Sequence, residues 1–395
     1  MKMNVLMDEK KEELVPEEQP PVKHRFRRFL IFSLTLILVL AVVVAAAYRD
    51  GTGFDVLRRY LTYGKAEKES GTATYTYDAG ASNRFAALGS SLVVLSDTTL
   101  QVLDGGTTVY STPVKMTAPA LAVGGGCAVA YDVGGTQLIL VNGSGELLNL
   151  TADESEPFLS ATLNAKGWLA VTSEKKNYKG AVSVYNGNRD LVFTYNASDR
   201  FVTEAYVSDD CRDLAAVTLG QKDSVFLSSI VLYHLSDTEP FADGSISNGL
   251  VLSLGGLSGK LSAVADTGLN FLDSSGETVG TYDYSGEYLR EYQLGGDGFA
   301  ALLLNRYRSG NVGRLVTVGN DGKEIASLDV TDEVLSVSAA GRYVGVLYAD
   351  RLAIYTENLQ EYASLSGTDY AKEVLMRSDG SALLVSSDRA SLFLP

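Results

Sequence analysis

The sequence predicts an all-β fold, a β-propeller of four-stranded blades, with one transmembrane helix near its N-terminus. The composition is the first observation, because the chain of 395 residues contains 39 Gly and 22 Tyr but only 8 Pro. Such a composition favours strands that are joined by tight turns. The second observation is a repeat of roughly 40 residues that covers most of the chain. The third is an uninterrupted apolar segment over residues 29–48.

The repeat is clearest in a short, strongly hydrophobic strand that returns eight times. Its spacing matches the length of one four-stranded propeller blade. The eight segments are residues 92–95, 128–131, 169–171, 214–217, 261–264, 300–303, 344–347 and 383–385.

A more polar hairpin follows the hydrophobic strand in seven of these units. Several of the hairpins turn at Asn-Gly, Asp-Gly or Ser-Gly pairs, which are good hairpin signals. The seven segments are residues 102–110, 140–148, 184–193, 232–241, 271–282, 317–328 and 354–365.

The last unit lacks this hairpin, because residues 390–395 leave no room for a fourth strand. Residues 72–77, in contrast, form a lone strand before the first unit. We therefore expect residues 72–77 to complete the last blade and close the ring, which hides an otherwise open sheet edge. The sequence predicts eight blades over residues 72–395, with seven blades as the alternative.

The apolar segment, FLIFSLTLILVLAVVVAAAY, contains 20 residues and no charge. A helix of that length spans roughly 30 Å, the thickness of a bilayer core. Four Lys or Arg residues lie within residues 23–28 and only Arg49 follows directly. The positive-inside rule then places the N-terminus in the cytoplasm. We predict an uncleaved signal-anchor, with cleavage near residues 45–47 as the alternative.

These features divide the chain into four parts. We expect a disordered cytoplasmic tail over residues 1–28, a transmembrane helix over 29–48, a juxtamembrane stalk over 49–71 and an extracytoplasmic propeller over 72–395. The lipid bilayer is therefore a predicted partner, through residues 29–48. The sequence places the protein in the cell membrane as a single-pass protein.

The charge of the outer region excludes one class of partner. Residues 71–395 carry 21 Lys or Arg against 38 Asp or Glu. A surface this acidic is poorly suited to nucleic acid, whose phosphates need a positive surface.

Catalytic and metal-binding chemistry is not indicated. The outer region has a single histidine, His234, whereas catalytic triads and most zinc sites use histidine. We interpret His234 as a structural or surface residue. Cys127 and Cys211 are too few for a disulfide framework. The sequence therefore predicts no catalytic residue, no metal site and no cofactor.

Three loops between the second and third strands of a unit stand out, because they are longer and richer in Lys, Arg and Tyr. In a propeller such loops share one face, where a basic and aromatic surface could attract a protein or an anionic envelope polymer. The alternative is that these long loops are simply solvated. The candidate ligand-facing residues are Lys175, Lys176, Tyr178, Lys179, Lys222, Arg306, Tyr307 and Arg308.

The repeats resemble those of WD40-like and quinoprotein-like propellers, although the Trp-Asp dipeptide is absent and Trp168 is the only tryptophan. The whole layout, with an acidic tail, a helix flanked by basic residues, Arg58-Arg59-Tyr60 in the stalk and a propeller, resembles an uncharacterised family of Firmicutes membrane proteins. This family is known as domain of unknown function 5711. The resemblance implies a clostridial type of origin and supplies no catalytic residues.

Taken together, these features predict a non-catalytic, membrane-anchored extracytoplasmic propeller that acts as a binding or scaffold module in the bacterial cell envelope. Propellers often serve as platforms, which is an analogy at the level of the fold. One alternative is an envelope polysaccharide hydrolase or lyase with its site in the propeller channel. Another is a transmembrane sensor subunit.

Overall fold

A computed structural model describes residues 24–50, 55, 59–60, 69–78, 80, 83–222, 225–246 and 249–395 of the chain. Side chains are not part of this description at residues 24–28, 44–50, 69–74, 222 and 245. The chain divides into two compact units, Met1–Arg58 and Arg59–Pro395. The predicted cytoplasmic tail lies largely outside the described residues, as does most of the predicted stalk.

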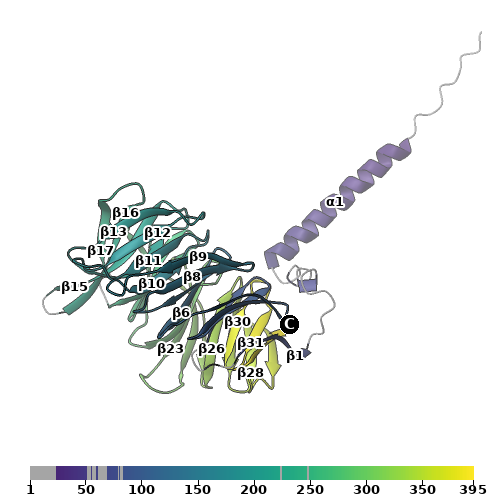
Figure 1. Cartoon of the computed structure of the whole chain (residues 1–395). Coiled ribbons are helices and arrows are strands. Elements are labelled where there is room, and N and C mark those ends of the chain that lie inside the picture. Colours follow the sequence, from purple (N-terminus) through teal and green to yellow (C-terminus); the bar gives the residue numbers. More distant parts are fainter. Residues whose placement is uncertain are drawn as a thin grey trace, which may run out of the picture. The chain divides into compact units, whose positions relative to one another are not determined.

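The second unit is an eight-bladed β-propeller, as the repeat predicts. Its described strands form eight antiparallel sheets of four strands each, and seven of these sheets follow chain order. The eighth has the order β1-β32-β31-β30. Figure 1 shows β1 beside the yellow C-terminal strands. The predicted closure of the ring by an N-terminal strand is therefore confirmed, and that strand already begins at Glu69.

The helix and strands have the following bounds. They are α1 (His24–Asp50), β1 (Glu69–Thr76), β2 (Arg84–Leu88), β3 (Ser91–Leu95), β4 (Thr99–Asp104), β5 (Thr107–Pro113), β6 (Pro119–Gly124), β7 (Cys127–Asp132), β8 (Gln137–Asn142), β9 (Gly145–Thr151), β10 (Phe158–Leu163), β11 (Leu169–Ser173), β12 (Ala181–Tyr185), β13 (Leu191–Asn196), β14 (Phe201–Val207), β15 (Asp213–Lys222), β16 (Val225–His234), β17 (Pro240–Ser245), β18 (Val251–Leu257), β19 (Lys260–Ala265), β20 (Gly268–Leu272), β21 (Thr278–Asp283), β22 (Tyr288–Gln293), β23 (Phe299–Asn305), β24 (Gly313–Gly319), β25 (Glu324–Val330), β26 (Val334–Ala340), β27 (Tyr343–Tyr348), β28 (Arg351–Thr356), β29 (Glu361–Ser366), β30 (Glu373–Met376), β31 (Ala382–Val385) and β32 (Arg389–Phe393).

Blades 1 to 7 begin with β2, β6, β10, β14, β18, β22 and β26, and blade 8 begins with β30. The second strand of a blade is buried on both faces, as in β3, β23 and β27. This burial explains the continuous apolar runs in the sequence, because a strand covered on both sides does not need to alternate. The fourth strands β21 and β25 alternate between exposed and half-buried residues, since one face of each meets water.

The hydrophobic core consists of eight clusters, each of which fills the seam between two neighbouring blades. The cluster between blades 8 and 1 joins Tyr75 of β1 and Leu383 of β31 to Leu92 and Val94 of β3. The ring is therefore closed by side-chain packing as well as by the pairing of β1 with β32.

Arg59 provides a further contact with blade 8. Its guanidinium donates to the carbonyl oxygen of Asp379 at 2.6 Å, to the hydroxyl of Tyr362 at 2.9 Å and to the carbonyl oxygen of Pro395 at 3.1 Å. Only 5% of Arg59 is exposed. A buried guanidinium needs such partners, because an unpaired buried charge is costly. The chain is thus fixed to the propeller before β1 begins.

In the first unit, α1 contains the predicted membrane segment. Its side chains are described from Phe29 to Val43, so part of the predicted span 29–48 falls outside that description. Within the part of the chain that the structure describes, no helix has the length and hydropathy that a membrane crossing requires.

The antiparallel order within a blade gives the propeller two distinct faces. The turns after the first and third strands lie at one end, which we call the turn face. The loops after the second strand and the connections between blades lie at the other end, which we call the loop face. The Arg59 contact with Asp379, in the turn between β30 and β31, lies at the turn face.

Candidate functional site

The loop face carries the predicted ligand-facing residues. Lys175, Lys176, Tyr178 and Lys179 lie between β11 and β12 of blade 3, whereas Arg306, Tyr307 and Arg308 lie between β23 and β24 of blade 6. Lys222 ends β15 of blade 4, and its side chain lies outside the description. The residues share one face, as predicted, but blade 5 separates the arginines from the lysines.

The lysine loop of blade 3 is less basic than its sequence suggests. Lys175 Nζ forms an ion pair with Glu156 Oε2 at 2.7 Å, and the backbone N–H of Lys176 donates to Glu156 Oε1 at 3.3 Å. Asp153 and Glu154 lie in the same connection between blades. This neighbouring acidic segment offsets the lysines, and no pattern within the loop itself could have revealed it.

Beside this loop lies a cavity of about 520 Å³, lined by Tyr178, Lys179 and Phe201 among others. Lys179 Nζ lies 4.6 Å from the centroid of the Phe201 ring. A cation over an aromatic face is attracted by the electron density of the ring. The same pairing occurs in blade 6, where Arg308 lies 5.8 Å from the centroid of the Tyr288 ring.

Exposed aromatic residues gather on this face. Within the described strands and loops from β1 onward, the exposed Phe and Tyr side chains all lie there, in blades 3, 4 and 6. Exposed aliphatic residues at the loop-face ends of strands in blades 4 and 5 enlarge the surface, for example Val225 at 58% and Leu252 at 51%. The aromatic set is Tyr178 at 46%, Phe201 at 56%, Phe226 at 61%, Tyr288 at 42% and Tyr307 at 62% exposed.

Sequence reasoning missed Phe201, Phe226 and Tyr288, which stand at the first or second position of a strand. The sequence did contain a signal for these three residues, because a large apolar residue directly after a loop on this face is a candidate for exposure. Phe226 also lies on the hairpin of β15 and β16. These two strands have 10 residues each and are longer than those of the other blades. Phe226 pairs with Gln221 near the far end of this hairpin.

The central channel is a second candidate region. The first strands of all eight blades line a cavity of about 990 Å³. Three glutamates, Glu204, Glu291 and Glu373, lie on these strands. Glu204 Oε1 accepts the N–H of Leu254 at 2.7 Å, and Glu291 Oε1 accepts the N–H of Val337 at 2.9 Å. Each of these two carboxylates thus connects its blade to the next.

Burial raises the pKa of all three glutamates. It raises the pKa of Glu204 to about 7, against the opposing effect of the hydrogen bonds from Leu254 and Ser253. The pKa of Glu373 also rises to about 7, through burial and then the charge of Glu291. These side chains are only partly exposed, and the protein around them removes much of the hydration of their carboxyl groups.

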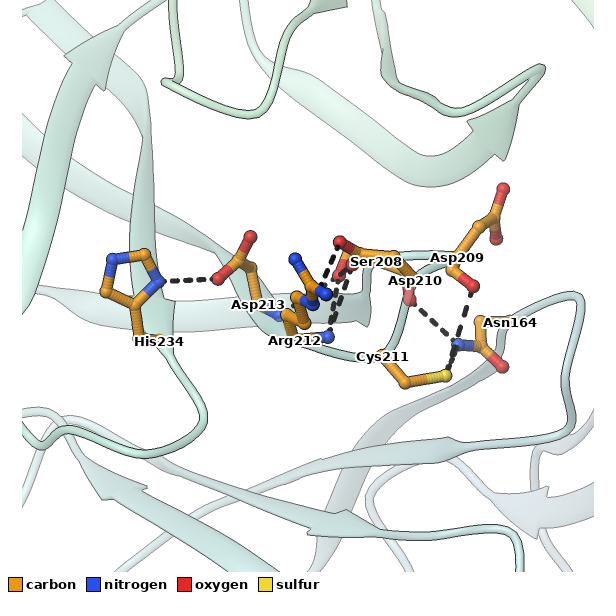
Figure 2. Close-up of polar contacts among 8 residues, drawn as sticks. All are labelled: Asn164, Ser208, Asp209, Asp210, Cys211, Arg212, Asp213 and His234. Carbon is orange, nitrogen blue, oxygen red and sulfur yellow. Dashed lines mark hydrogen bonds and ion pairs between the residues drawn. The ribbon is translucent and has the colours of Figure 1, made fainter.

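His234 and the cysteines form no catalytic arrangement among the described residues. His234 Nδ1 lies 2.6 Å from Asp213 Oδ1, and its other ring nitrogen points away from Cys211 (Figure 2). Cys127 and Cys211 are both free thiols. In the described part of the chain, no group of three or more His, Cys, Asp or Glu side chains is placed to hold a metal ion.

This fold and these surfaces define a WD40-like β-propeller with an aromatic loop face. Residues 62–390 match the family described as "Family of unknown function (DUF5711)", so the chain belongs to that family. The predicted resemblance is confirmed. A search among curated proteins finds no match.

Several solved propellers resemble this chain in fold. The C-terminal WD40 domain of Sif2 has a TM-score of 0.57 at 14% identity, over 82% of this chain and 98% of that one. BamB from Moraxella catarrhalis has a TM-score of 0.51 at 12% identity, over 81% and 98%. Apo AztD from Citrobacter koseri has a TM-score of 0.50 at 12% identity, over 72% and 86%. At such identities the likeness concerns the fold alone.

Proposed function

We propose that this protein is a non-catalytic docking platform of the bacterial cell envelope. Residues 29–48 anchor it in the cell membrane, and the propeller lies outside the cytoplasm. Support for the anchor comes from the 20 uncharged residues and the basic residues that precede them. Such a segment is long enough to span a bilayer and is oriented by its flanking charges.

The observation that carries the docking role is the clustering of exposed aromatic residues on the loop face. Monomeric proteins rarely expose large contiguous apolar surfaces without a partner. Tyr, Phe and Arg are also enriched in the cores of protein interfaces, where their burial supplies most of the binding energy. The loop face provides this combination through Phe226, Tyr288, Tyr307 and Arg308.

The partner that fits this surface is a protein with apolar and acidic side chains. Val225 of blade 4 and Leu252 of blade 5 are exposed aliphatic residues on the same face, and aliphatic contacts suit a protein surface. Arg306 and Arg308 have no ion-pair partner among the described residues, so they are available for carboxylates. A protein partner is therefore favoured over an anionic envelope polymer, which stays as the second outcome of the test.

The non-catalytic part of the proposal rests on how the ionisable side chains are used. Glu204 and Glu291 accept backbone N–H groups of the next blade, so they serve the seams of the propeller. His234 is held by Asp213 and points away from the thiol of Cys211.

Photo-crosslinking in living cells tests the docking role. A benzoylphenylalanine at position 226 or 307 should give one discrete adduct with the same partner protein, whereas the same group at Val109 on β5 should give none. Adding Arg306→Ser and Arg308→Ser to the 226 variant should abolish that adduct. Equal adducts from all three positions would contradict the proposal.

A binding assay with purified cell walls separates the polymer from the protein. The variant with serine at Lys175, Lys176, Arg306 and Arg308 should sediment with walls to the same extent as the unchanged chain. A loss of wall binding in this variant, without a crosslinked partner, would replace the protein by an anionic polymer as the ligand of the loop face.

A further inference from the structure

The turn face contains a cavity that the proposed docking role does not use. Its volume is about 650 Å³, within the usual range for small-molecule sites. Residues of three consecutive blades line it, with Trp168 and Val192 from blade 3, Ser274 from blade 5 and the remainder from blade 4. A smaller cavity of about 150 Å³ adjoins it and shares Asp210, Asp213 and Ser274.

Asp210, Cys211 and Arg212 of the turn between β14 and β15 line the larger cavity, and Figure 2 shows the contacts of this turn. The Ser208 hydroxyl donates to Asp210 Oδ1 at 2.6 Å and accepts the N–H of Asp213 at 3.0 Å. Asn164 of blade 3 donates to the carbonyl oxygen of Ser208 at 2.9 Å. These bonds fix the polar residues of the turn in place, which lowers the entropic cost of binding a ligand there.

His234 is also held in a defined orientation. Asp213 binds its Nδ1 at 2.6 Å, and Phe241 stacks on its ring with a centroid separation of 4.0 Å and an interplanar angle of 10°. Because the carboxylate of Asp213 accepts from Nδ1–H, the neutral ring presents Nε2 as an acceptor. Just over half of the His234 side chain is exposed, at 53%, and the residue lines the cavity.

Further hydrogen-bonding groups line the same cavity. Among the described residues, the indole N–H of Trp168 and the hydroxyls of Ser236 and Ser274 have no partner. The Arg212 side chain is 82% exposed, and its Nε lies 3.9 Å from Asp210 Oδ2, its one ion-pair contact in the described part of the chain. Trp168, Val192 and Leu235 add apolar surface to the same walls.

This combination selects the chemistry of the ligand. An aromatic ring with apolar neighbours suits the C–H face of a pyranose, while donors and acceptors at the rim suit its hydroxyl groups. The positive charge of Arg212 is offset by the negative charges of Asp210 and Asp213, so the cavity offers no net positive charge for an anion. We propose that this cavity binds a neutral oligosaccharide, with Trp168 as its stacking surface and Arg212, His234 and Ser274 as hydrogen-bonding residues.

The only tryptophan of the chain lies in this cavity, so its fluorescence reports on this site alone. Titration of the full chain in detergent with maltohexaose, cellohexaose or chitohexaose should give a saturable change in Trp168 emission for one of them. Arg212→Ala should weaken this binding about tenfold, and Ser274→Ala should also weaken it. Arg342→Ala, which changes an arginine on the turn face outside the cavity, should leave it unchanged.

Trp168→Phe removes the reporter, so calorimetry measures the binding of that variant, which should be weaker. Circular dichroism tests whether each variant keeps its β-structure. Binding is compared only among the variants that keep it. The proposal is overturned if none of the three sugars changes the emission at millimolar concentration. It is also overturned if Arg212→Ala binds as tightly as the unchanged chain, or if an oligogalacturonate binds better than the neutral sugars.

Discussion

At the residue scale, Glu204 shows how a carboxylate is affected by its position in the channel. Its pKa of about 7 in the folded protein exceeds the ordinary value of 4.5 because burial disfavours the charge. The group therefore binds its proton more tightly in the folded state than in the unfolded state. Its contribution to stability is retained below pH 4.5 and is lost as the pH rises to about 7.

Glu204→Gln should remove this loss. The amide oxygen still accepts the N–H of Leu254, but no charge forms. We expect the variant to be more stable than the unchanged chain by roughly 1–3 kcal/mol at pH 8, and similar to it at pH 4.5. Urea unfolding followed by Trp168 emission measures the difference. Glu333→Gln, at an exposed position, is the control, and an equal effect in both variants would contradict the assignment.

Cys211 shows a residue-scale feature that the sequence does not reveal. Its φ is 65°, a left-handed conformation that glycine adopts at the corresponding positions of two other blades, Gly167 and Gly380. The three turns share a hydrogen bond from this residue to the third residue before it. These three turns can be aligned with one another only after the strands of each blade are known. The cysteine that stands in place of glycine is therefore visible only in the structure.

At the scale of single elements, the sequence was sufficient for most of the propeller. The eight apolar segments became the second strands because that position is covered by neighbouring blades on both sides. The closure by residues 72–77 was also predictable, since the last unit lacks a strand and a free edge needs a partner. The length of β15 and β16 was not, because the residues that extend them resemble those of an ordinary loop.

Replacement of a buried side chain in β1 tests the closure of the ring. Tyr75 is 2% exposed and packs in the cluster between blades 8 and 1. Tyr75→Ala should lower the free energy of unfolding by about 3–5 kcal/mol, the usual cost of removing a buried aromatic ring. Tyr307→Ala on the exposed loop should cost less than about 0.5 kcal/mol. Equal stabilities of the two variants in urea unfolding would show that β1 does not close the ring.

At the scale of the whole molecule, the two faces of the propeller have different character. The loop face combines aromatic, aliphatic and arginine side chains, whereas the turn face contains the Arg59 contact and the cavity at Trp168. The sequence indicated the loop face through Tyr178, Tyr307 and their basic neighbours. It did not indicate how acidic connections such as residues 153–156 offset the lysines, because that depends on which loops become neighbours in space.

The central claim is that the loop face is displayed outside the cytoplasm on a protein anchored by residues 29–48. The most direct measurement is labelling of single cysteines in intact cells with a membrane-impermeant maleimide, in a chain with Cys127→Ala and Cys211→Ser. Phe226→Cys should be labelled in intact cells, and Lys10→Cys only after permeabilisation. Labelling of Lys10→Cys but not Phe226→Cys in intact cells would contradict the account.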